Sequence, residues 1–189
     1  IKSLIENKFS IESLEISTKS LKIKNLVSFL RSFRNSPELF LLEKVIRNGY
    51  LIADIKLEFD SDGNIINNYE VNGFLRDTKL SIFNKYNLQK LDLIFNYKND
   101  NLLLSDISFI LNDLKFLSEN ISVKKDKDDF LMGGEIRHNE LAFNEKNLNL
   151  LIKPFFSEID FEKLRFSSKN NFLFKINKKF EFNDFTLDS

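Results

Sequence analysis

A long alternating pattern across residues 50–123 constrains the fold of this chain most. Within 51–59 every second side chain is apolar, and the side chains between them are mostly charged. The alternation returns at 91–97 and, more loosely, at 103–111 and 117–123. A period of two is typical of a strand with one buried face. The stretch therefore predicts an antiparallel meander with one apolar side.

Two short helices are predicted before the meander. From Asn25 to Phe33 the apolar residues recur at three and four positions, with Asn25 as the N-cap. Ser36, Pro37 and Glu38 have the order of a cap, a first-turn proline and a first-turn acid, so residues 36–38 predict the start of a second helix. Arg47 is placed in its last turn and Gly49 at its end. The predicted class is mainly β, an elongated, curved antiparallel sheet that forms a groove of repeated strands, with two short helices near the N-terminus.

The turn residues divide the meander further. Asp62-Gly63 predicts a hairpin between Phe59 and Ile65, and Gly73 predicts a bulge. A separate short strand is expected at 80–82, and turns are expected at 98–101 and 124–129.

The last third is less regular. Residues 130–136 predict a strand that Gly133 and Gly134 interrupt, and 148–152 predict a strand that stops at Pro154. Residues 172–176 are expected to pair with 180–182.

One spacing recurs along the chain. Residues 9–16, 102–109 and 180–187 each carry apolar side chains at a first position and then two, five and seven residues later. The recurrence favours a strand-repeat architecture, and any amphipathic strand with a bulge produces the same spacing. We interpret residues 1–189 as a single partial repeat domain, an excerpt of a longer chain, with a helix pair at 21–49 packed on the sheet and a β-meander at 50–189.

Composition excludes several classes of function. The 28 Lys and Arg residues balance 28 Asp and Glu residues, so no net charge attracts nucleic acid or an anionic membrane. The absence of cysteine excludes disulfides and thiol chemistry. No apolar run approaches the length of a transmembrane helix.

Motifs for catalysis or metal binding are weak. His138 is the only histidine, Glu135 and Glu140 are near it in sequence, and an exposed loop histidine is the expected interpretation. Glu135 is expected on the opposite strand face from His138. Residues 60–64 do not fit a calcium loop and predict a plain turn. We expect no enzyme, no catalytic residues, no metal and no cofactor.

The residue pattern of the first predicted strands resembles that of a known family. A helix that ends at 45–49, an alternating strand, the Asp62-Gly63 turn and the sequence VNGFLRDTKL at 71–80 are similar to AsmA-like proteins, in particular the large YhdP and TamB types. The strand phrases at 91–95 and 117–123 also resemble that family. The resemblance covers about Leu21 to Ile136.

The resemblance implies a periplasmic protein of the bacterial envelope, anchored in the inner membrane through a segment outside this sequence. It implies a β-groove that carries phospholipids between the inner and outer membranes, with phospholipid acyl chains and the two membranes as partners and no nucleic acid. Head groups would remain in water, so no head-group pocket is expected. The alternation provides the candidate groove lining: Leu51, Ala53, Ile55, Leu57, Phe59, Leu91, Leu93, Phe95, Ile107 and Phe109.

Two alternatives remain open. The first is a structural or scaffolding β-domain of an envelope assembly protein, with a closed core and no lipid. The second is an outer-membrane barrel, which fits the alternation but not the helix pair or the lack of Trp with only four Tyr.

Overall fold

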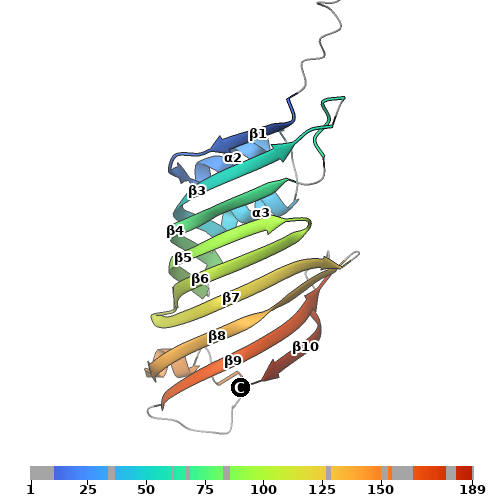
Figure 1. Cartoon of the computed structure of the whole chain (residues 1–189). Coiled ribbons are helices and arrows are strands. Elements are labelled where there is room, and N and C mark those ends of the chain that lie inside the picture. Colours follow the sequence, from blue (N-terminus) through green and yellow to red (C-terminus); the bar gives the residue numbers. More distant parts are fainter. Residues whose placement is uncertain are drawn as a thin grey trace, which may run out of the picture.

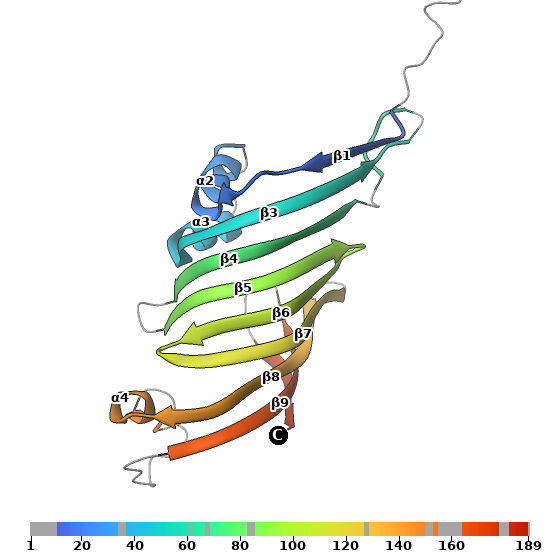
Figure 2. The same ribbon diagram turned by 60° about the vertical axis from the view of Figure 1, so that its left-hand side comes forward.

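The computed structural model describes residues 11–33, 37–60, 62–66, 69–82, 86–126, 129–149, 153–154, 164–177 and 182–188. Within these residues ten strands form one antiparallel sheet, in which neighbours in space are mostly neighbours in sequence. The sheet is a long, twisted ladder with β1 at one edge and β10 at the other (Figures 1 and 2). The strands are β1 (Ser13–Ser17), β2 (Leu21–Lys22), β3 (Ile46–Glu58), β4 (Glu70–Ile82), β5 (Tyr86–Lys98), β6 (Asn101–Leu111), β7 (Leu114–Asp126), β8 (Asp129–Phe143), β9 (Leu164–Ile176) and β10 (Phe182–Asp188). The predicted class, a mainly β fold with an elongated antiparallel sheet and two short helices near the N-terminus, is confirmed.

The two predicted helices are α2 (Ile23–Phe33) and α3 (Pro37–Val45). Figure 1 shows them behind the first strands of the sheet. Helix α2 begins two residues before Asn25, so the predicted N-cap is wrong. Its buried side chains are Ile23 and Val27, whereas the predicted apolar face residue Phe29 is 59% exposed. Contact with the sheet determines which face of α2 is buried, because Ile23 and Val27 pack on Ile46 of β3.

Helix α3 ends earlier than predicted. It begins at Pro37, as expected, but Ile46 already pairs with Leu80 as the first residue of β3. Arg47 and Gly49 therefore lie in a strand and not at a helix end. Gly49 has φ of +138°, and a Cβ there would lie 2.5 Å from the Thr78 hydroxyl, which explains the glycine without a helix cap. Ser36, the predicted cap, lies outside the described residues.

Three glycine predictions within the strands are wrong. Gly73 pairs in regular register with Ala53 and Phe95, so no bulge occurs there. A Cβ at Gly73 would lie 2.2 Å from the Ile52 carbonyl oxygen and 2.8 Å from the Phe95 ring, so close packing requires the glycine. Gly133 and Gly134 do not interrupt their strand, because β8 runs through both.

The recurring spacing coincides with a shift of strand register in β6 and in β10. In β6 the register relative to β5 shifts between Ser105 and Ser108, and Asp106 within this interval has φ of +49°. This shift returns the following apolar side chains to the same face, so Leu104 and Ile107 join one apolar cluster. Register shifts of this kind also occur in β4, β5, β7, β8 and β10. The strand expected separately at 80–82 is for this reason the end of β4.

Tight turns connect several strands. Asn99 and Asp100, between β5 and β6, both have positive φ, as a two-residue hairpin of type I′ requires. The predicted turn at 98–101 is therefore confirmed. The predicted hairpin between Phe59 and Ile65 is also confirmed, because these residues form an antiparallel bridge.

The chain after β8 differs from the prediction. Residues 145–147 form a short helix, α4 (Glu145–Asn147), whose first turn is capped by the Asn144 side chain. Leu148 follows this helix and is buried against Leu114 and Phe143, so the strand expected at 148–152 is wrong at its start. Residues 150–152 lie outside the described residues. The pairing of β9 with β10 is as predicted, with Phe182 opposite Ile176.

Candidate functional site: the apolar inner face

One face of the sheet carries a continuous apolar row. We call it the inner face and define it by Leu93, Ile107 and Ile121, which are buried in one cluster. Cross-strand pairing joins one residue from each strand into a central row that runs from β3 to β10 at right angles to the strands. The row consists of Ala53, Gly73, Phe95, Leu104, Ile121, Gly134, Phe172 and Leu187.

Most of the apolar side chains around the buried cluster are only half-buried. Seven of them pack against it from five strands: Leu75, Leu91, Phe95, Leu104, Phe109, Met132 and Phe172. A core sealed by a second layer would bury such side chains fully. Among the described residues, the inner face is thus packed at its base, and the surrounding apolar side chains stay partly exposed.

In the described part of the chain, the elements that pack on this face lie toward its two ends. Helix α2 packs against β2 and β3, and α3 packs against β3 and β4. Leu148, next to α4, packs at the other end, against Leu114 and Phe143. Among the described elements, the inner side of β5 and β6 is left between these two covers.

All ten predicted lining residues fall within the described part of the chain. Ala53, Leu93 and Ile107 are buried. The other seven are half-buried: Leu51, Ile55, Leu57, Phe59, Leu91, Phe95 and Phe109. Leu51 lies in the cluster under α2, whereas Leu91, Phe95 and Phe109 surround the uncovered cluster. The prediction missed Leu104, Met132 and Phe172, because their strands read as less regular than 51–59. The recurring spacing at 102–109 was the signal that would have found Leu104.

The prediction that His138 lies in an exposed loop is wrong. The residue lies in β8 with 4% of its surface exposed. The bulge in β8 and the ring of Phe166, 4.5 Å away between centroids and nearly perpendicular, enclose it. Its Nε2 atom lies 2.8 Å from Ser168 Oγ, which accepts a hydrogen bond of 2.6 Å from Asn170. As predicted, Glu135 is not its partner, because the Glu135 carboxylate pairs with Lys169 at 2.6 Å.

This environment makes folding sensitive to pH. Burial lowers the pKa of His138, an effect that the Phe166 backbone opposes. Below about pH 6.5 His138 therefore binds a proton in the unfolded chain but stays neutral in the folded chain. The free energy of unfolding decreases as the pH falls. We expect the urea midpoint to decrease between pH 8 and pH 5.5, and His138→Gln to remove part of that decrease. An equal decrease of the urea midpoint in both proteins would contradict the assignment of the pH dependence to His138. Carboxylates with lowered pKa values stay ionised between pH 8 and pH 5.5, so they do not cause a decrease in this range.

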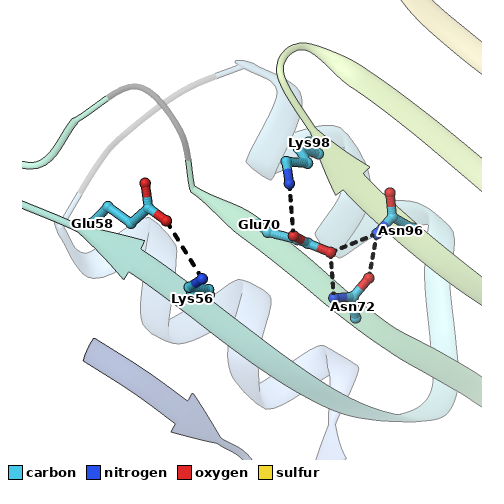
Figure 3. Close-up of polar contacts among 6 residues, drawn as sticks. All are labelled: Lys56, Glu58, Glu70, Asn72, Asn96 and Lys98. Carbon is cyan, nitrogen blue, oxygen red and sulfur yellow. Dashed lines mark hydrogen bonds and ion pairs between the residues drawn. The ribbon is translucent and has the colours of Figure 1, made fainter. Parts of the chain in front are cut away.

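The opposite, outer face carries polar networks. On β4 and β5 the Glu70 carboxylate accepts hydrogen bonds from Asn72 (2.9 Å), Asn96 (3.2 Å) and Lys98 (3.1 Å), as Figure 3 shows. These bonds, that of Asn72 foremost, lower the pKa of Glu70. Because the network is solvent-exposed, its contribution to stability is small. The apolar side chains of Ile52, Phe74 and Ile94 form a smaller group on the same face.

The acidic turn at residues 60–64 is self-contained. The Asp60 carboxylate accepts hydrogen bonds of 2.9 Å from the backbone amides of Asp62 and Asn64, and the Asn64 side chain also donates to it. These bonds, Asn64 foremost, lower the pKa of Asp60. The plain turn that the sequence predicted is confirmed. In the described part of the chain, no group of three or more His, Asp or Glu side chains is arranged to hold a metal ion.

Comparison with known proteins gives no relative. No protein-family model matches the chain, and no curated protein or solved structure matches it significantly. The resemblance to AsmA-like proteins therefore stays a prediction. None of the helices in the described residues is long and apolar enough to cross a bilayer.

Proposed function

We propose that this chain is a segment of a periplasmic groove protein that carries phospholipids between the inner and outer membranes without catalysis. The inner face holds the acyl chains, and anchoring in the inner membrane belongs to a segment outside this sequence. One observation supports the proposal above all: half-buried apolar side chains from β4, β5, β6, β8 and β9 surround the buried cluster of the inner face. Apolar surfaces of this kind mark binding sites for apolar partners.

The energetics of lipid movement favour such a surface. Exposing an acyl chain to water costs about 0.8 kcal/mol per methylene, so a chain of about 16 carbons does not cross water unaided on a useful timescale. Contact with an apolar face removes much of this cost. Because the central row crosses every strand from β3 to β10, a lipid moves along it without a break in apolar contact.

A charge on the central row tests this function. Phe95→Lys is expected to remove co-purifying phospholipid, measured by native mass spectrometry and lipid extraction, because the ammonium group meets the acyl chain. The fold should persist, since Phe95 is half-buried and a lysine stem extends to water. The matched control is Ile94→Lys on the outer face, where the side chain is 47% exposed, and it should leave bound lipid unchanged.

A second pair tests continuity along the sheet. Phe172→Lys, four strands from Phe95 in the central row, should reduce bound lipid in the same way, and its outer-face neighbour Leu173→Lys should not. A wild-type protein that is purified without lipid and binds none from vesicles would contradict the proposal and favour the structural β-domain.

A further inference from the structure

A polar hollow lies at one end of the inner face. It has a volume of about 260 Å³ and is lined by Tyr69, Tyr97, Asn99, Asp100 and Lys125. Tyr97 is two residues from Phe95 along β5, and its strand neighbours are the apolar Val71 and Leu102. The hollow therefore adjoins the apolar surface directly. The sequence analysis did not predict this hollow.

The hollow combines two opposite charges with two aromatic rings. The rings of Tyr69 and Tyr97 stack with centroids 5.6 Å apart. The Tyr97 hydroxyl donates a hydrogen bond of 3.1 Å to Asp100 Oδ1, and Lys125 Nζ lies 3.8 Å from Asp100 Oδ2. The hydrogen bond with Tyr69, burial and the contact with Asp100 raise the pKa of Tyr97, so its hydroxyl stays a donor.

The backbone holds these groups in place before any ligand arrives. Asp100 is in the type I′ turn, with φ of +58°, and its carbonyl oxygen accepts a hydrogen bond of 3.2 Å from the Lys125 amide. The turn also fixes Asn99, whose carbonyl oxygen accepts from the Asn101 side chain at 2.8 Å. A site with ordered backbone loses little entropy on binding.

The chemistry of the hollow is complementary to a zwitterion. A lysine ammonium and tyrosine hydroxyls are donors for a phosphate. A carboxylate beside aromatic ring faces attracts an alkylammonium group. The balance of one cation and one anion gives an anionic ligand no net attraction.

We propose that this hollow is a head-group site for zwitterionic phospholipids, in which Lys125 and a tyrosine hydroxyl contact the phosphate and Asp100 with the tyrosine rings contacts the ammonium group. This inference rests on the proposed function, because the acyl chains of the same lipid lie on the adjacent inner face. It adds selectivity between lipids that share acyl chains and differ in head-group charge.

The test compares two lipids with identical acyl chains. Protein is incubated with vesicles of phosphatidylethanolamine or of phosphatidylglycerol, and protein-bound lipid is quantified. The wild type should prefer phosphatidylethanolamine by about tenfold, which corresponds to one or two charge-assisted contacts. Asp100→Asn should lose most of this preference, and Asp100→Lys should reverse it, because two adjacent cations favour the anionic lipid.

The control uses the ion pair on the outer face of the same hairpin. Lys98→Gln removes the contact with Glu70 at 3.1 Å and should leave the preference unchanged. Equal binding of both lipids by the wild type, or an unchanged preference in both Asp100 variants, would overturn the head-group site and leave the groove intact. Absence of all lipid from the wild type would overturn the proposed function and the head-group site with it.

Discussion

Leu93→Glu is expected to unfold the sheet. Leu93 is 8% exposed and packs on Ile107 and Ile121 at the base of the inner face. A glutamate there buries a carboxylate without a partner, and we expect a loss of more than about 3 kcal/mol, a large part of the stability of a domain. Circular dichroism during urea unfolding measures the loss, and the variant is expected to accumulate in the insoluble fraction.

The matched control is the next residue in β5. Ile94 points to the outer face with 47% of its surface exposed, so Ile94→Glu should change stability by no more than about 0.5 kcal/mol. A stable, soluble Leu93→Glu protein would show that the base of the inner face admits water. In that case the buried cluster could not be the floor against which acyl chains pack.

Gly134→Ala is expected to destabilise the middle of the sheet. Gly134 lies in the central row, and an added Cβ would be 2.5 Å from the Asn120 carbonyl oxygen and 2.9 Å from the Ile121 Cα. Both atoms belong to the backbone of β7, so relief requires movement of the β7 and β8 pairing. Overpacking of this kind costs about 1–3 kcal/mol, which thermal or urea unfolding detects.

Its neighbour provides the control with the same chemical change. A Cβ at Gly133 would lie 2.9 Å from Leu173 Cδ1, the far end of an exposed side chain that is free to rotate. Gly133→Ala should therefore stay within about 0.5 kcal/mol of the wild type. Equal losses in the two variants would indicate that the strand conformation, and not the approach of β7, determines both glycines.

Local patterns predicted most of the secondary structure. Alternation in 51–59 and 91–97 marked β3 and β5, and Pro37 marked the start of α3. The errors occur where pairing with a strand distant in sequence determines the conformation of a segment. Residues 46–49 continue a helical pattern, yet they become strand because β4 offers Leu80 as a pairing partner for Ile46.

The polar features were the least predictable. His138 carries no local sign of burial, and only the pairing of β8 with β9 brings Ser168 and Phe166 around it. The polar hollow joins Tyr69 to Lys125, which lie 56 positions apart in the sequence, and no strand periodicity relates residues at that separation.

The amino-acid sequence by itself determined a mainly β chain with one apolar face, because side-chain alternation is a property of each strand alone. It also contained the recurring bulge spacing, which keeps that face apolar along strands such as β6. Only the tertiary structure decided that the strands pair in chain order and that, among the described elements, no helix packs on the middle of the inner face. The physical reason is that strand pairing and the packing of helices on a sheet depend on contacts between segments distant in sequence. The periodicity of any one segment does not encode those contacts.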